Sequence, residues 1–291
     1  MARKILKNDT IAVTIDSCGA EMVSLQNAAG EEYLWNGDPA YWKRHAPVLF
    51  PLVGSLKNKQ YRLGDKIYQM NQHGFARDME FSFLEEKDGE CWFRLTENMA
   101  TLTMYPYEFI LDIGYRIGDN CLENIWRVTN PASRPLHFSI GGHPAFVCPR
   151  RPGESQTAYA LRFDTDKPLL ASVIGEGGLV QTATRPVATD GGLLVIGEHL
   201  FDKDALVIEE NQAHRVSLVD PEGVEYVTVS FDAPLFGVWS CPGKKAPFVC
   251  IEPWYGRCDG DGFTGSWEER IWGNTLAPGE CFEGGFKVEI R

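Results

Sequence analysis

Apolar and polar residues alternate with a period of two along most of the patterned segments of the chain, rather than with the 3.6-residue period of a helix. The alternation is clearest in residues 11–15, 91–95 and 109–117. Further candidate strands lie at residues 122–128, 193–196, 216–219, 226–231, 236–239, 248–251 and 282–290. Because turn-forming Gly, Pro, Asn and Asp residues separate these segments, the pattern predicts an all-β fold, a large antiparallel β-sandwich.

Helical patterning is weak throughout the chain. No long segment combines an apolar stripe with capping residues, so any helices are predicted to be short and peripheral. Residues 153–192 are rich in Gly, Thr and Pro and are predicted to form long loops between strands. Since no change of composition and no internal repeat divides the chain, we predict a single domain over residues 1–291.

The charge balance restricts the class of partner. The 291 residues include 28 Lys and Arg against 40 Asp and Glu, a formal net charge of -12. This balance argues against binding to nucleic acid or to an anionic membrane surface and is compatible with a small neutral ligand. No apolar stretch approaches the length of a membrane helix or of a signal peptide, so a cytoplasmic location is predicted.

Cofactor and metal motifs are missing from the sequence. The eight cysteines are scattered without a C-x-x-C pair, which favours reduced thiols over a zinc site or a disulfide framework. Residues 175–178 lack the third glycine of a dinucleotide loop, and no phosphate-binding loop or H-E-x-x-H pair is present. We therefore predict an activity that needs no cofactor and no metal.

Unusual polar residues stand in apolar surroundings in four short segments. Residues 44–54 contain two prolines within an apolar run, which excludes a central strand there. In residues 72–77, His73 and Arg77 stand four positions apart beside a glycine that permits close approach of a ligand. An imidazole transfers protons near neutral pH and a guanidinium binds hydroxyls or oxyanions, although both side chains are equally compatible with a loop that satisfies its own carbonyls.

The third and fourth segments each contribute a titratable side chain. His143 lies between two glycines and a proline that fixes the following backbone, an arrangement that suits either an oriented imidazole or a simple turn. Glu252 ends an apolar strand directly before a proline, so its carboxylate needs a ligand, a cation or backbone donors. Such a set of histidines and one carboxylate suits general acid–base catalysis without a cofactor.

Taken together, these segments resemble the aldose 1-epimerase (galactose mutarotase-like) family, and within it a LacX-like subgroup. The resemblance covers nearly the whole chain and rests on HAPVLFPLVGSLKNKQY, QHGFARDMEF, GGHPAF, VCIEPWYGRCD and TLAPGECFEGGFKVEI. It implies a β-supersandwich, a role in carbohydrate metabolism and the interconversion of the α and β anomers of a sugar by an isomerase without a cofactor.

The resemblance also implies roles for individual residues. By position in the shared motifs, Glu252 corresponds to the family's catalytic base, His143 to its catalytic acid, and His73 to the histidine that binds near the ring oxygen. Asp204 is the candidate for the family's sugar-binding aspartate. As aromatic platforms for the sugar we expect Trp239 and Trp254, since rings pack against sugar C–H faces.

The sequence departs from the family at a sugar-binding arginine. Where typical members carry an Asn-Arg pair, this chain has residues 54–57, and Arg77 is expected to substitute. The HGFAR motif is shared with hexose-6-phosphate epimerases, and a phosphate site built from Arg44, Lys57 and Arg77 is therefore the alternative to a free hexose. We favour the free hexose because of the acidic net charge.

Two other classes of protein remain as alternatives. A catalytically silent sugar-binding module would use platforms such as Trp42, but would not need a facing acid and base. A glycoside hydrolase usually needs two carboxylates that flank the scissile bond, and only Glu252 stands in a suitable place.

Overall fold

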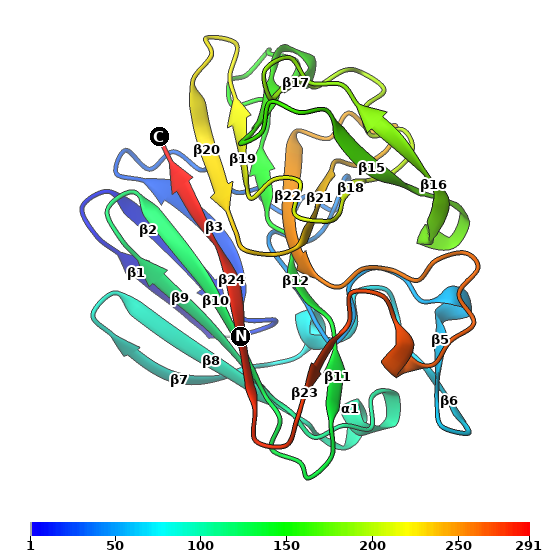
Figure 1. Ribbon diagram of the computed structural model, residues 1–291. Coiled ribbons are helices and arrows are strands. Elements are labelled where there is room, and N and C mark those ends of the chain that lie inside the picture. The colour runs from blue at the N-terminus through cyan, green and yellow to red at the C-terminus, as the bar shows by residue number, and fades with distance from the viewer. Residues whose placement is uncertain (1) are drawn as a thin grey trace.

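The computed structural model describes residues 2–291, and strands of antiparallel sheets dominate it (Figure 1). The larger sheet has nine strands in the order β17 (Leu193–Val195), β14 (Ala160–Phe163), β19 (Arg215–Val219), β20 (Glu225–Ser230), β24 (Cys281–Ile290), β10 (Cys121–Thr129), β9 (Ile110–Ile117), β8 (Glu90–Thr96) and β7 (Ser82–Lys87). The predicted all-β class is confirmed.

A second large sheet, of eight strands, carries the residues of interest. Its order is β16 (Val180–Val187), β15 (Leu169–Ile174), β18 (Leu206–Ile208), β21 (Leu235–Trp239), β22 (Phe248–Tyr255), β12 (Ile140–Gly142) and β4 (Val48–Leu49), and β13 (Ala145–Val147) also pairs with β22. The smaller sheets are β1 (Arg3–Lys7), β2 (Ile11–Asp16) and β3 (Glu21–Asn27), then β11 (Leu136–Phe138) with β23 (Asn274–Leu276), and β5 (Gln60–Leu63) with β6 (Lys66–Gln69).

The two large sheets pack face to face through aromatic side chains. Trp126 of β10 packs edge-on against Phe286 of β24, with ring centroids 5.7 Å apart, and against Tyr255 of β22, at 6.4 Å. At the other end, Phe163 of β14 meets Phe236 of β21 at 6.2 Å. Rings of this size contribute most of the apolar area in such a core.

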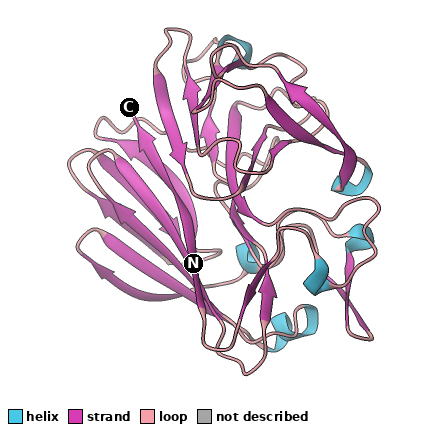
Figure 2. Ribbon diagram, in the orientation of Figure 1, coloured by secondary structure: helices cyan, strands magenta, loops and turns pink. Residues whose placement is uncertain are grey.

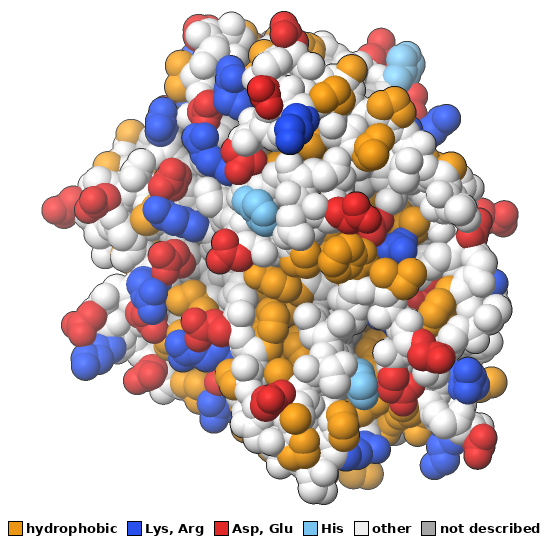
Figure 3. All heavy atoms as spheres, in the orientation of Figure 1, with side chains coloured by type: hydrophobic (Ala, Val, Ile, Leu, Met, Phe, Trp, Pro, Cys, Tyr) orange, Lys and Arg blue, Asp and Glu red, His pale blue; other side chains and the backbone are white. Residues whose placement is uncertain are grey.

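Helices are short and peripheral, as predicted (Figure 2). α1 (Met99–Met104) is capped by Asn98, whose side chain accepts hydrogen bonds from the backbone of Ala100 and Thr101. The remaining helical turns are η1 (Lys57–Lys59), η2 (Ala76–Asp78), η3 (Gln156–Ala158), η4 (Glu176–Gly178) and η5 (Trp267–Glu269). No helix within residues 2–291 has the length and apolar character needed to cross a bilayer. Acidic and basic side chains are intermingled on the face drawn in Figure 3.

The prediction for residues 153–192 was wrong, because this stretch contains β14, β15 and β16 rather than only loops. The physical reason is clearest in β16, which lies at the edge of its sheet and leaves most of its side chains exposed. Polar residues therefore occupy positions that would be apolar in a buried strand, and the alternating pattern is lost.

Strand β22 is longer than the predicted segment 248–251 and continues through Pro253 to Tyr255. Alternate residues of a strand direct their amides to the same neighbour, and Ile251 donates to the carbonyl of Pro144. Pro253 therefore faces that side as well and has no N–H to donate. The missing donor lies where β12 ends and β13 begins, so the proline is accommodated by a break in the neighbouring ladder.

Candidate active site

All seven residues that the sequence predicts for the site line one cavity of about 320 Å³. They are His73, Arg77, His143, Asp204, Trp239, Glu252 and Trp254. Two larger hollows, of about 520 and 750 Å³, lie elsewhere on the protein. The smaller cavity differs from them because four of its lining residues, Arg77, His143, Glu252 and Trp254, hold buried polar atoms without a hydrogen-bond partner among residues 2–291. Buried polar groups of this kind are uncommon in folded proteins and point to a place where a ligand binds.

Glu252 reaches the cavity because side chains alternate along β22. Val249 and Ile251 join the main hydrophobic core, whereas Cys250 and Trp254 belong to separate clusters on the opposite face. Glu252 shares the second face, in the middle of the strand and opposite Gly237 of β21. An even spacing from Cys250 and Trp254 thus places the carboxylate in the cavity rather than between the sheets.

His143 occupies the break between β12 and β13. Its backbone N–H donates to the carbonyl of Pro47 at 3.1 Å, which ties this short connection to the segment 44–54. The imidazole stacks on Trp42, with ring centroids 4.7 Å apart, and meets Trp239 edge-on at 5.5 Å. Aromatic packing on two sides therefore fixes the orientation of the ring.

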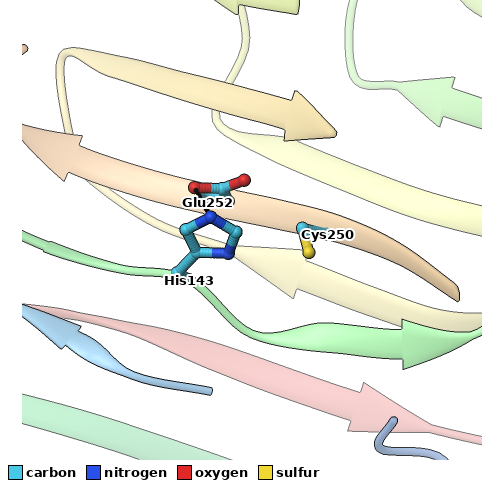
Figure 4. A group of neighbouring side chains, drawn as sticks. All are labelled: His143, Cys250 and Glu252. Atoms are coloured by element: carbon cyan, nitrogen blue, oxygen red, sulfur yellow. Dashed lines mark ion pairs between the residues drawn. The ribbon is translucent and has the colours of Figure 1, made fainter. Parts of the chain in front are cut away.

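The side chains of His143 and Glu252 face each other in the wall of the cavity (Figure 4). Nε2 of His143 lies 3.2 Å from Oε2 of Glu252, but the contact is not aligned as a hydrogen bond, and this carboxylate oxygen has no other partner in residues 2–291. The second ring nitrogen, Nδ1, also lacks a partner there. Both side chains are almost completely buried. An imidazole and a carboxyl group thus lie side by side, each with an atom that has no hydrogen-bond partner among residues 2–291.

Burial moves the two pKa values in opposite directions. Removal from water raises the pKa of Glu252 well above its ordinary range; the Asp204 carboxylate adds to this effect, and the Trp254 side chain opposes it. Burial also lowers the pKa of His143 to about 3, helped by the positive charge of Arg77. Both groups therefore favour their neutral forms, and in that state the single proton of the pair lies on Glu252.

His73 is placed beside His143, with ring centroids 5.6 Å apart. Its backbone N–H donates to the carbonyl of Gly54, and its Nδ1 accepts the N–H of Gly54 at 3.1 Å. Burial lowers the pKa of His73 well below its ordinary value, so the ring is neutral and its proton lies on Nε2. His73 is therefore a hydrogen-bond donor toward the cavity.

Trp254 lies between two glycines on the neighbouring strands. A Cβ atom at Gly141 would lie 2.6 Å from the indole, and one at Gly237 would lie 2.5 Å from it. Both distances are far below a van der Waals contact, so these positions must lack a side chain for the ring to lie flat on the sheet. The flat indole forms one wall of the cavity.

Of the three basic residues named for a phosphate site, only Arg77 lines the cavity, although Arg44 lies beside it and both contact Asp78. Arg77 lines the cavity, but Arg44 is paired with Asp78 at 2.8 Å, and Lys57 lines a separate hollow. Burial and the charge of Arg44 lower the pKa of Arg77 to about 10, and its Nε, 4.0 Å from the Asp78 carboxylate, has no hydrogen-bond partner in residues 2–291.

Some lining residues were not predicted. Trp42 was named only as a platform in the alternative of a silent binding module, although it stacks on His143. Gly178 and Ile174 come from the stretch predicted as loops, and nothing in their own sequence pattern indicates a site. Asp204 lines the cavity but is exposed, and it holds a left-handed backbone with its side chain bonded to the next amide.

A second buried ionic pair involves Asp259, which follows Cys258 of the cavity lining. Nε of Arg270 lies 2.8 Å from Oδ1 of Asp259. The guanidinium also donates to the carbonyl of Arg257 and to the hydroxyl of Ser139, while Oδ2 of Asp259 accepts the N–H of Lys57. These bonds join the end of β22 to residues 54–57, which border the cavity.

Comparison with known proteins identifies the family to which this architecture belongs. The family model described as Aldose 1-epimerase matches residues 4–283. The chain belongs to the aldose 1-epimerase family. The chromosomal protein LacX of Lactococcus lactis subsp. lactis is 32% identical over 260 residues, which cover 86% of this chain and 87% of LacX.

Solved structures agree with this assignment. A galactose mutarotase related enzyme from Lactobacillus acidophilus is 33% identical and superposes with a TM-score of 0.94, covering 100% of this chain and 97% of its own. A galactose mutarotase-like protein from Lactobacillus casei ATCC 334 is 32% identical, with a TM-score of 0.93 and complete coverage of both chains. The resemblance inferred from the sequence motifs is confirmed, and this member of the aldose 1-epimerase family is an isomerase that acts on a sugar.

Proposed function

We propose that the protein interconverts the α and β anomers of a free aldose by general acid–base catalysis, with Glu252 as base and His143 as acid. The observation that carries this proposal is the buried pair itself. A carboxyl group and an imidazole, whose pKa values burial shifts in opposite directions, lie 3.2 Å apart in a cavity of the size of a small ligand. Each has an atom without a hydrogen-bond partner among residues 2–291. A merely structural pair would have its lone pairs and protons satisfied.

The reaction needs only the single proton that the pair holds. While the cavity is empty this proton rests on Glu252; before ring opening it passes across the 3.2 Å contact to His143, which leaves Glu252 a carboxylate. Glu252 then removes the proton of the anomeric hydroxyl while His143 protonates the ring oxygen, which breaks the bond between the anomeric carbon and the ring oxygen. Rotation about C1–C2 exposes the other face of the aldehyde, and closure with the two roles reversed returns the proton to His143. Each positioned group is expected to contribute about 10²–10⁴-fold to the rate.

The surrounding residues suit a sugar in size and polarity. The neutral His73 offers an N–H donor for a ring or hydroxyl oxygen. The indoles of Trp42, Trp239 and Trp254 offer apolar faces to sugar C–H groups.

A free sugar is favoured over a phosphorylated one by the placement of charge. A phosphate dianion is usually held by several basic groups, whereas Arg77 is the one Lys or Arg side chain among the described residues that line this cavity. Asp204 adds a negative charge to the same cavity. The alternative site of Arg44, Lys57 and Arg77 is therefore not supported.

The test measures exchange between α and β anomers of free aldoses by NMR, after subtraction of the spontaneous rate. Glu252→Gln and His143→Asn should each slow exchange at least about 10²-fold while the circular dichroism spectrum stays unchanged. Glu283→Gln and His137→Asn are matched controls, because their side chains do not line this cavity. Near wild-type exchange in either site variant would overturn the assignment of that residue.

The same assay distinguishes the two classes of substrate. The wild-type protein should have a higher kcat/KM for at least one free hexose than for its 6-phosphate. A kcat/KM for the 6-phosphate that is about a hundredfold higher would replace the free sugar by a phosphorylated one.

A further inference from the structure

Three side chains with different donor atoms lie close together, and two of them line the cavity. One donor atom each from His143, Cys250 and Glu252 lies within 4.8 Å of the other two, and all three residues are buried. Figure 4 shows the imidazole pointing to the Glu252 carboxylate, with the Cys250 thiol beside it. Cys250 does not line the cavity and has no part in the acid–base step proposed above.

We propose that His143, Cys250 and Glu252 form a binding site for a zinc-class divalent cation, and that occupation of this site switches the epimerase off. Imidazole nitrogen, thiolate sulfur and carboxylate oxygen are the three ligand types that zinc takes from proteins. Three such ligands with a remaining open position are typical of accessible zinc sites, and here the open position faces the cavity that His143 and Glu252 line.

The distances require only a small contraction. Zinc bonds of about 2.0–2.3 Å in a tetrahedral arrangement place neighbouring donor atoms about 3.5 Å apart. The donor atoms here lie within 4.8 Å, so they need to approach one another by about 1 Å. Unpartnered atoms on His143 and Glu252 mean that no hydrogen bond to those atoms has to be broken for this movement.

Charge balance also favours a divalent cation at this site. A thiolate, a carboxylate and a neutral imidazole carry two negative charges, which a divalent cation neutralises in surroundings where an uncompensated charge is costly. On binding, Cys250 loses its thiol proton, and His143 and Glu252 lose the proton that they share. Two protons therefore leave for each cation bound. A bound cation displaces protons even from a buried thiol, whose pKa burial raises.

Inhibition follows from the proposed function, whereas the metal site does not depend on it. If His143 and Glu252 are the acid and the base, a cation that occupies both removes the proton they share. Magnesium should not compete, because it prefers oxygen ligands in octahedral geometry.

The first experiment detects the site without measuring activity. Co²⁺ added to the chelator-treated protein should produce a thiolate-to-cobalt charge-transfer band at one equivalent, and Zn²⁺ should remove the band. Cys250→Ser, which nearly preserves the volume, and Cys250→Ala should both abolish the band and weaken Zn²⁺ binding at least about 100-fold. Cys258→Ala is the matched control, since this cysteine lines the cavity but lies outside the group.

The second experiment connects binding to catalysis. Zn²⁺ should inhibit anomer exchange by the wild-type protein, EDTA should restore it, and Mg²⁺ should have no effect. The folded Cys250 variants should exchange anomers like the wild type and resist Zn²⁺. Absence of the cobalt band, its persistence in both Cys250 variants, or its loss in Cys258→Ala would overturn the site. A band that depends on Cys250 without inhibition would keep the site and contradict the roles proposed for His143 and Glu252.

Discussion

Two buried ionisable pairs of this protein differ in how completely their polar atoms are hydrogen-bonded. Asp259 and Arg270 are 2.8 Å apart, and further bonds link them to Lys57, Ser139 and Arg257. His143 and Glu252 are 3.2 Å apart and keep unpartnered atoms. Burial alone therefore does not mark a functional group. The difference teaches that buried polar atoms indicate a site when they lack hydrogen-bond partners and also line a cavity.

The largest effect is expected when the bonded pair is broken. Asp259→Ala leaves the buried Arg270 guanidinium without its counter-charge, so the free energy of unfolding should fall by about 3–5 kcal/mol. Urea denaturation followed by circular dichroism measures this loss. Lys245→Ala is the control, because Lys245 and its partner Glu198 are both exposed and loss of this pair should cost far less. Equal losses in the two variants would remove the distinction between the pairs.

The unpartnered pair should respond in the opposite sense. Glu252→Gln is expected to raise the free energy of unfolding at neutral pH by about 1–3 kcal/mol, because the wild-type carboxyl group gains free energy by ionising when the chain unfolds, whereas an amide does not ionise. The folded-state pKa of Glu252 lies above its ordinary value of 4.5, so the wild type loses stability as the pH rises from that value toward the folded-state pKa.

The gain measured for Glu252→Gln should therefore increase with pH above about 4.5. Denaturation at several pH values measures it, and the exposed Glu283→Gln should show no such trend. A loss of stability in Glu252→Gln would mean that the carboxylate is satisfied after all.

A smaller effect is expected for Arg77, whose Nε is also unpartnered. If the guanidinium binds sugar hydroxyls, Arg77→Ala should lower kcat/KM by about tenfold for free hexoses and for their 6-phosphates alike. Lys57→Ala is the control, since Lys57 lines a different hollow. A loss confined to the phosphates, and reduced by added salt, would instead identify a phosphate site.

The smallest effect concerns pH. Because the pKa of His143 is lowered to about 3 and that of Glu252 is raised well above 4.5, the pair should keep its single proton in the mildly acidic range above pH 4.5, where an ordinary carboxyl group loses its proton. We expect kcat/KM to change by no more than about twofold over that range. If the acid and the base had ordinary pKa values, kcat/KM would instead change about tenfold over that range. Activity should decline at higher pH, where the single proton is lost.

The sequence predicts those parts of the fold in which one face of a strand is buried and the other is not. Residues 11–15 alternate clearly and residues 122–128 are a further candidate strand, and they correspond to β2 and β10. β16 was missed because its edge position leaves polar residues on both faces. The single-domain prediction over residues 1–291 stays a prediction.

The site was predictable in its polar residues and not in its geometry. His143 and Glu252 attract notice because each stands beside a proline in an apolar run. Their contact depends on the break between β12 and β13, which the spacing of 109 positions between them does not encode. Cys250 escapes notice because a lone cysteine in an apolar strand looks like a core residue.

The alternation of faces along β22 restricts how this segment can change in length. Removing or inserting one residue between Phe248 and Glu252 would turn every following side chain to the other face. The carboxylate would then point into the packed core and the neighbouring aliphatic side chain into the cavity, so a single deletion would damage both at once. Changes of two residues would preserve the orientation. Lineages of this protein should therefore tolerate length variation in β22 only in even steps.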